Sequence, residues 1–339
     1  MTKTSVVITS IYPFNDVMQK ILEGCQKHHW DFIVSGDTIS HNLEADGLIY
    51  LDVTKQLDSG FSYAKKAPFR NYCRKNVGYL HAIKNGSTRI IETDDDNFPK
   101  DSFFTPFEKN IQTKKITQKG WVNAYRYFTE NEQIWPRGFS LSDVKRKIDT
   151  YESLSEKTLY CPVQNGLVDN DPDIDALYRI LFTIPFNFEH QNRKIAYQKG
   201  SWCSFNTQNT VFYEEVFPLM YQPATPQFRE ADILRSLVIQ RILWENNAHV
   251  MFYSPTVWQE RNEHDLMDDL KQETRLYAHI KDVSADLETL SLKPGAEFFQ
   301  DNMIKCYEVY HRYGFVEKLE FDLIQAWFAD LKNIQNGKN

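Results

Sequence analysis

The sequence lacks the signature motifs of several large enzyme classes. It contains no G-x-G-x-x-G dinucleotide fingerprint, no P-loop, no H-E-x-x-H or H-x-x-x-H pair and no G-x-S-x-G nucleophile elbow. Each of these motifs sets reactive or ligand-binding groups at a fixed spacing. Their absence argues against a Rossmann dinucleotide enzyme, a Walker-type nucleotide hydrolase, a zinc hydrolase and a serine hydrolase of the α/β type.

Cysteine is also scarce and follows no ligand or disulfide pattern. The 339 residues include five cysteines, an odd number, and no C-x-x-C spacing. This argues against a disulfide framework and a cysteine-rich zinc site, and it indicates a reducing compartment. The first residues hold only a short apolar run, which fits neither a signal peptide nor a membrane span. We expect a cytoplasmic protein without a transmembrane segment, either free or peripheral to the inner face of a membrane.

Positive charge is not in excess. The chain has 39 Lys and Arg against 46 Asp and Glu, a formal net charge of −7, which argues against a nucleic-acid binder held by phosphate contacts. Apolar residues make up 42% and aromatic residues 14%, so the chain has enough apolar material for a large core. The aromatic excess fits core packing as well as exposed rings that stack on a sugar or a base.

Apolar runs and helical periodicities alternate over the first hundred residues. The pattern predicts strands at 5–11, 30–35, 47–53 and 88–93 and helices at 14–27 and 68–85. This alternation is typical of an α/β fold with a mainly parallel sheet. Such sheets bind ligands beyond the carboxyl ends of their strands, where Thr9, Ser10, Asp37 and a run of three aspartates fall.

The character of the chain changes after residue 258. Helical patterning dominates at 260–280, 295–311 and 316–334, with few strand signals. We therefore predict one large domain at 1–258 and a helical C-terminal region at 259–339.

The most distinctive motif is Glu-Thr-Asp-Asp-Asp-Asn at 92–97. It follows a predicted buried strand directly, so Asp94 and Asp96 would point to the same side of an extended chain. Two carboxylates at this spacing suit Mg²⁺ or Mn²⁺, which keep coordination positions open for diphosphate oxygens. A solvated acidic loop is the alternative interpretation.

Polar residues elsewhere are also candidates, each with a structural alternative. The cluster of Arg70, Arg74, Lys75 and Asn76 could neutralise a diphosphate or form a solvated helix face. The stretch 202–210 mixes amides, hydroxyls and rings that suit a hydroxyl-rich ligand, but the same residues form ordinary turns. Three further aspartates are expected at helices. Asp173 would be the N-cap of a helix at 174–182. Asp175 lies four residues before Arg179 and Asp232 three residues before Arg235, and these two spacings would also give plain ion pairs.

Several of these residues fall in blocks that resemble a known family. The blocks read RKNVGYL at 74–80, DDDN at 94–97, YCPVQNGLVDNDPDIDA at 160–176, NTQNT at 206–210, and DILRS at 232–236 followed by QR at 240–241. Between about residue 4 and residue 258 they resemble the STELLO glycosyltransferase-like proteins, and more distantly the reversibly glycosylated polypeptides, which are UDP-arabinopyranose mutases. The resemblance implies a GT-A-type fold that binds a nucleoside diphosphate sugar through an aspartate motif and a divalent metal.

On this resemblance we expect a metal-dependent glycosyltransferase. It would transfer a sugar from a nucleoside diphosphate sugar, with UDP as the expected nucleotide, to a glycan or other hydroxyl acceptor, in the setting of cell-surface polysaccharide synthesis. Asp94 and Asp96 would hold Mn²⁺ or Mg²⁺, and Asp232, or else Asp175, would be the catalytic carboxylate. The residues expected around the nucleotide are Thr9, Ser10, Asp37, Arg70, Arg74, Lys75, Asn76 and Asp95. The residues expected around the sugar or acceptor are Trp202, Asn206, Gln208, Asn209, Arg235 and Arg241.

Two other functions stay open on the sequence. A nucleotide-sugar mutase or nucleotidyltransferase would use the same fold, and a non-catalytic scaffold for polysaccharide enzymes would retain the fold without turnover. A homo-oligomer or a complex with other glycosyltransferases is compatible with each of them.

Overall fold

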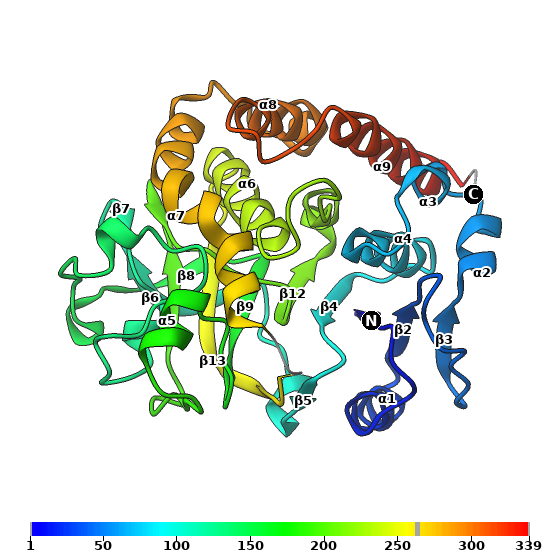
Figure 1. Ribbon diagram of the computed structural model, residues 1–339, viewed down its shortest axis with the longest axis horizontal. Coiled ribbons are helices and arrows are strands. Elements are labelled where there is room, and N and C mark those ends of the chain that lie inside the picture. Colours follow the sequence, from blue (N-terminus) through cyan, green and yellow to red (C-terminus); the bar gives the residue numbers. More distant parts are fainter. Residues whose placement is uncertain (1, 262–264, 338–339) are drawn as a thin grey trace.

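The computed structural model describes residues 2–261 and 265–337. An eleven-stranded sheet forms its centre, in the order β3-β2-β1-β4-β12-β9-β13-β10-β6-β8, with β5 paired to β13. The first four strands of that order are parallel to one another, as the sequence predicts: β3 (Leu48–Leu51), β2 (Asp31–Ser35), β1 (Thr4–Thr9) and β4 (Arg89–Thr93). This sheet, with its flanking helices, confirms the predicted α/β class (Figure 1).

The second half of the sheet combines both strand directions. β9 and β13 are parallel to each other and run in the direction of β4, whereas β12 between β4 and β9 runs the opposite way. The bounds of these strands are β5 Asn97–Pro99, β6 Asn110–Ile116, β8 Glu156–Tyr160, β9 Val163–Asp169, β10 Lys194–Tyr197, β12 Asn209–Tyr213 and β13 Val250–Gln259. A separate two-stranded sheet pairs β7 (Gly120–Trp121) with β11 (Ser201–Trp202).

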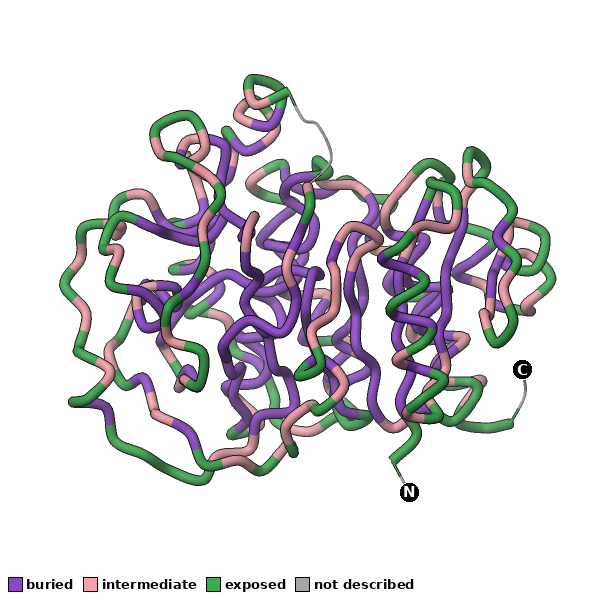
Figure 2. The backbone as a smooth tube through the Cα atoms, turned by 90° about the horizontal axis from the view of Figure 1, so that it is seen from below, coloured by how far each residue is buried: buried purple, intermediate pink, exposed green. Residues whose placement is uncertain are grey.

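Helices cover both faces of the parallel strands, because side chains alternate between the faces along each strand. Val6 and Ile8 of β1 pack with α1 (Asp16–His28) on one face, whereas Val7 packs with α4 (Lys75–Lys84) on the other. Figure 2 shows the central segments as buried and the periphery as exposed. The remaining described α-helices are α2 Val53–Asp58, α3 Ser62–Lys66, α5 Ala176–Leu181, α6 Ala231–Glu245, α7 Leu266–Thr289, α8 Phe299–Arg312 and α9 Leu319–Gln335.

The helix predicted at 68–85 begins later than the sequence suggests. Arg70 adopts a positive φ of 53°, a conformation that a right-handed helix does not contain. Asn71 then caps a short 3₁₀ turn at Tyr72–Arg74, and α4 follows. The prediction is therefore wrong for residues 68–71, which form a loop instead of a first helical turn.

The C-terminal part of the chain is helical in its described residues. α7, α8 and α9 lie in a row over the helices on one face of the sheet (Figure 1). α7 packs on α5 and α6, α8 on α6, and α9 on α3 and α4. A domain boundary at residue 258 stays a prediction. No helix in the described part of the chain is both long and apolar enough to cross a membrane.

Candidate functional site

A cavity of about 610 Å³ opens at the carboxyl ends of the parallel strands. Thr9 and Ser10 reach it from the end of β1, Asp37 from the loop after β2, and Asp94 and Asp96 from the loop after β4. Ligand sites form at these ends because the loops there diverge to the two faces of the sheet. The structure thus brings together residues that are up to about 90 positions apart in the sequence.

The three aspartates of the motif have different environments. Asp94 Oδ1 accepts hydrogen bonds from the Tyr72 hydroxyl at 2.6 Å and from Lys75 Nζ at 3.0 Å. Asp95 Oδ2 accepts one from Ser10 Oγ at 2.5 Å. Asp96 Oδ2 accepts one from Gln259 Nε2 at 2.8 Å, whereas its buried Oδ1 has no hydrogen-bond partner among the described residues.

Burial makes the ionised forms of two of these carboxyl groups unfavourable. It raises the pKa of Asp95 to about 6 and the pKa of Asp96 to about 7, and the negative charge of Asp94 adds to both shifts. Carboxylates crowded in this way are stabilised by a cation.

The aspartate loop fits a divalent cation in part. Asp94 and Asp96 both line the cavity, and their carboxylate oxygens, among them the unpartnered Oδ1 of Asp96, are hard ligands of the kind that Mg²⁺ and Mn²⁺ prefer. However, no group of three or more His, Cys, Asp or Glu side chains among residues 2–261 and 265–337 is arranged as a complete metal site. A cation here would need further oxygen ligands from a substrate.

The predicted basic cluster is partly used inside the protein. Arg74 lines the cavity, but its side chain is buried and its guanidinium donates to Gln56 Oε1 and to the carbonyl oxygens of Ala64 and Ala67. Lys75 Nζ is fully buried and bonds Thr93 O, the Tyr72 hydroxyl and Asp94.

The two other members of this cluster, Asn76 and Arg70, differ in whether they reach the cavity. Asn76 lies outside the cavity, since its side chain binds the Tyr63 hydroxyl and the backbone of Gln222. The structure thus does not bring Asn76 to the cavity, and its role as a nucleotide ligand stays a prediction. Arg70 is exposed and lines the cavity, so it is the member of the cluster most accessible to a ligand.

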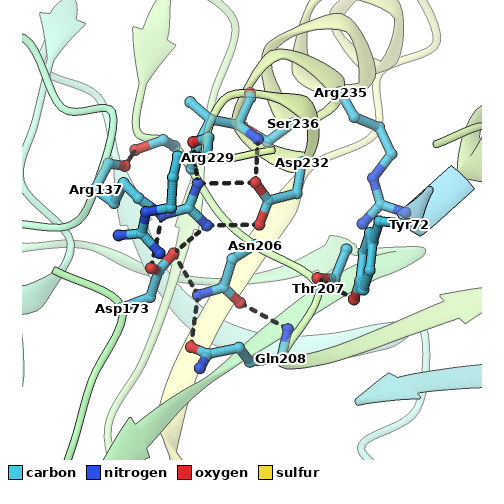
Figure 3. Close-up of polar contacts among 12 residues, drawn as sticks. Tyr72, Arg137, Asp173, Asn206, Thr207, Gln208, Arg229, Asp232, Arg235 and Ser236 are labelled. Atoms are coloured by element: carbon cyan, nitrogen blue, oxygen red, sulfur yellow. Dashed lines mark hydrogen bonds and ion pairs between the residues drawn. The ribbon is translucent and has the colours of Figure 1, made fainter. Parts of the chain in front are cut away.

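An arginine that the sequence analysis missed organises the opposite wall. Arg137 lies between Asp173 and Asp232 (Figure 3), and donates to Asp232 at 2.9 and 2.7 Å and to Asp173 at 2.8 and 3.0 Å. Although burial opposes its charge, the two carboxylates raise the pKa of Arg137 above its ordinary value. Burial likewise opposes ionisation of Asp173, but Arg137 lowers the pKa of that carboxyl. No spacing pattern in the sequence links position 137 to positions 173 and 232.

The residue that caps the start of α5 differs from the predicted one. Asp175, and not Asp173, is the N-cap of α5, because its Oδ1 accepts from the amide of Tyr178 at 2.8 Å. Its Oδ2 accepts from Trp135 Nε1 at 2.6 Å, and the residue does not line the cavity. The structure thus does not bring Asp175 to the cavity, and its role as a catalytic carboxylate stays a prediction. Arg179 pairs with Asp171 instead of with Asp175.

Trp202 and Asn209, predicted as sugar or acceptor ligands, are buried and have partners within the protein. Trp202 is 1% exposed, and its Nε1 donates to Glu288 Oε1 at 2.6 Å. Its ring packs against that of Trp244, with the two ring centroids 4.3 Å apart. Asn209 donates to Leu167 O and Thr256 Oγ1 between adjacent strands. The sequence gives no sign of this burial, because exposed and buried tryptophans occur in similar local patterns.

Two predicted arginines of α6 also bind within the protein. Arg235 forms a buried ion pair with Glu92 of β4. Arg241 donates to the carbonyl oxygens of Leu287 and Leu290 at the end of α7. Neither lines the cavity, and contact of either arginine with a substrate stays a prediction. They hold α6 to the sheet and to α7.

The remaining predicted residues lie at or beside the cavity in the structure. Asn206 lies behind its wall, where Nδ2 donates to Asp173 Oδ2 at 2.9 Å and to Gln208 Oε1 at 3.1 Å (Figure 3). The predicted residues that line the cavity are Thr9, Ser10, Asp37, Arg70, Arg74, Asp94, Asp95, Asp96, Gln208 and Asp232. The roles of these residues stay predictions.

Comparison with known proteins supports the resemblance found in the sequence. The chain is 24% identical over 325 residues to the probable glycosyltransferase STELLO2 of Arabidopsis thaliana, a match that covers 89% of this chain and 41% of the relative. It is 26% identical over 277 residues to the probable glycosyltransferase STELLO1 of the same plant, covering 75% and 35%. The chain thus spans less than half the length of these curated relatives. The resemblance to the STELLO proteins is confirmed, whereas no protein-family model matches.

Solved structures give a weaker likeness. Glucosyl-3-phosphoglycerate synthase from Mycobacterium tuberculosis, solved with Mn²⁺ and UDP-glucose, matches with a TM-score of 0.40 at 9% identity, over 82% of this chain and 77% of that one. A second mycobacterial protein matches with a TM-score of 0.39 at 9% identity, over 85% and 74%.

Proposed function

We propose that the chain is a metal-dependent glycosyltransferase that uses a nucleoside diphosphate sugar, with UDP as the nucleotide, and a glycan or other hydroxyl acceptor. One observation carries the proposal: two aspartates of the motif line a cavity at the carboxyl ends of β1, β2 and β4, and one oxygen of Asp96 is buried without a hydrogen-bond partner among the described residues. The names of the curated relatives support the same activity.

The aspartate loop would receive the diphosphate end of the donor. Asp94 and Asp96 would hold Mn²⁺ or Mg²⁺, which when bound stabilises the negative charge of a departing diphosphate. Gln259 fixes the Asp96 carboxylate by its hydrogen bond, and Tyr72 with Lys75 fixes that of Asp94. Arg70, exposed at the rim of the cavity, would share the remaining phosphate charge.

The part of the cavity at the carboxyl ends of β1 and β2 would bind the nucleoside. Asp37 Oδ1 accepts from the amide of Thr38 at 2.6 Å and Oδ2 from the amide of Asn71 at 3.2 Å. These contacts orient a carboxylate whose remaining lone pairs would accept from nucleoside hydroxyl or N–H groups. Thr9 and Ser10 border the same part of the cavity.

Asp232 is the carboxylate best placed to act on the acceptor. Arg137 donates to both of its oxygens and the amide of Ile233 donates to Oδ1, which leaves Oδ2 with a further lone pair. A carboxylate held in this way would orient an acceptor hydroxyl and, in a reaction that inverts configuration, take its proton.

Donor binding measured by calorimetry tests the proposal. UDP should bind the wild-type chain in the presence of Mn²⁺, and Asp94→Ala with Asp96→Ala should weaken it by at least about 100-fold, because both ligands of the cation are lost. Asp101→Ala with Asp301→Ala is the matched control, since both side chains are exposed and outside the cavity. Wild-type affinity for UDP in the Asp94/Asp96 variant would contradict the metal assignment.

A further inference from the structure

Three arginines that line the cavity are not among the residues proposed to bind the donor. Arg179 comes from α5, Arg229 from the loop before α6, and Arg261 from the segment after β13. Their side chains are only 6%, 8% and 10% exposed. Three cationic side chains from separate parts of the chain are thus buried around one wall of a ligand-sized cavity.

The carboxylates that pair with these arginines lie behind that wall. The ion pairs are Arg179 with Asp171, Arg229 with Glu273 and Asp269, and Arg261 with Asp269. The charges balance in number, but all three arginines line the cavity, whereas none of their three carboxylate partners does. The surface that a ligand meets there is therefore cationic.

Some of the hydrogen-bonding capacity of this wall is unused. The buried Arg179 Nε has no acceptor among the described residues. Arg229 Nη2 lies 2.6 Å from Glu273 Oε1 but out of line for a hydrogen bond, since Nε makes the aligned bond to that oxygen at 2.9 Å. Buried guanidinium donors without acceptors cost free energy, and an anionic oxygen would satisfy them.

The arginines also repel one another. Burial, together with the positive charges of Arg179 and Arg229, lowers the pKa of Arg261 to about 10. A bound anion would relieve this repulsion at the same time as it accepts the spare donors.

We propose that Arg179, Arg229 and Arg261 form an anion subsite that binds a carboxylate or phosphate group carried by the transferred sugar or by the acceptor. The inference rests on the proposed function, because it takes the donor diphosphate to lie at the aspartate loop. It narrows the substrates from hydroxyl compounds in general to reactions in which the transferred sugar or the acceptor carries an anionic substituent.

Two matched pairs of ligands distinguish the sources of the anion. In the donor pair, UDP-glucose and UDP-glucuronate are titrated in the presence of Mn²⁺. In the acceptor pair, glucose and glucose 6-phosphate are titrated onto protein saturated with UDP and Mn²⁺. The wild-type chain should bind the anionic member of one pair at least about tenfold more tightly, as expected for a charge-assisted hydrogen-bonded contact.

Variants of Arg261 assign this preference to the subsite. Arg261→Gln should abolish the preference, and Arg261→Lys should retain part of it because the charge is kept. Arg312→Gln is the matched control, since Arg312 is exposed on α8 and pairs with Asp286. The inference is overturned if neither pair shows a preference, or if Arg261→Gln weakens UDP as much as it weakens the anionic ligand, which would assign the arginines to the nucleotide phosphates.

The same titrations separate this inference from the proposed function. Failure of UDP to bind the wild-type chain with Mn²⁺ would contradict the proposed function alone. The subsite is then tested by titrating glucuronate and glucose 6-phosphate without nucleotide, where the preference over glucose and its loss in Arg261→Gln are still expected. Equal weak binding of all three sugars would overturn the subsite.

Discussion

Asp175 is a buried carboxyl group whose proton affinity affects folding. Burial, with a smaller contribution from Glu273, raises its pKa to about 7. An unfolded aspartate has a pKa of about 3.9, so the folded chain binds a proton that the unfolded chain releases between these values. The contribution of Asp175 to stability is therefore complete below about pH 4 and is lost as the pH rises towards 7.

Chemical denaturation at several pH values tests this at the scale of one residue. From pH 4 to pH 7 the wild-type chain should lose on the order of 3 kcal/mol of unfolding free energy relative to Asp175→Asn, which cannot ionise. The exposed Asp282→Asn should reproduce the wild-type profile. Parallel pH profiles of the wild-type chain and Asp175→Asn would show that the folded carboxyl titrates normally.

At the scale of elements, α9 holds a loop of the cavity in place. The buried Glu320 accepts hydrogen bonds from the amides of Ala224 and Thr225, from the Thr225 hydroxyl and from the Tyr221 hydroxyl. Ala224 and its neighbours Gln222, Pro223 and Pro226 line the cavity. Asp330 of the same helix accepts from the amides of Ser62 and Tyr63 at the start of α3. The C-terminal helix thus supports the cavity without lining it.

Removal of the Glu320 carboxylate should therefore affect both stability and binding. Glu320→Ala leaves buried donors unpaired, which should lower the free energy of unfolding by about 3 kcal/mol and weaken UDP binding. Glu317→Ala on the exposed side of the same turn is the control. Denaturant titration and calorimetry measure the two effects, and an unchanged midpoint for Glu320→Ala would show that α9 does not hold the loop.

At the scale of the whole molecule, the C-terminal helices share the core of the sheet. Val283 of α7, Tyr307 of α8 and Trp327 of α9 belong to the same buried cluster as Val7 of β1 and Ile90 of β4. Direct hydrogen bonds, such as that from the Tyr310 hydroxyl to Leu234 O at 2.6 Å, add to this contact. One continuous core favours folding as a single cooperative unit.

Calorimetric unfolding tests this cooperativity. The full chain should unfold in one transition, and a chain ending at residue 259 should show no cooperative transition, because the faces of α4 and α6 that α7, α8 and α9 cover would be exposed to water. A truncated chain that unfolds cooperatively would support a separate domain at 1–258.

The sequence by itself determined the features that depend on neighbours along the chain. The runs of β-branched residues specified β1, β2 and β4, because a buried strand is a local pattern. The aspartate motif was found in the same way, since it follows β4 directly. These features were enough to predict an α/β fold and the position of the cavity at the strand ends.

Only the tertiary structure decided how the long polar and aromatic side chains are used. Trp202, Arg235 and Asn76 have the chemistry of ligand-binding residues, but each finds its partner in a distant part of the chain and is buried there. Arg137 joins Asp173 and Asp232 across gaps of 36 and 95 residues. Such partners are set by how elements pack in space, which no local pattern records, so the arginine-lined wall of the cavity became visible only in the folded molecule.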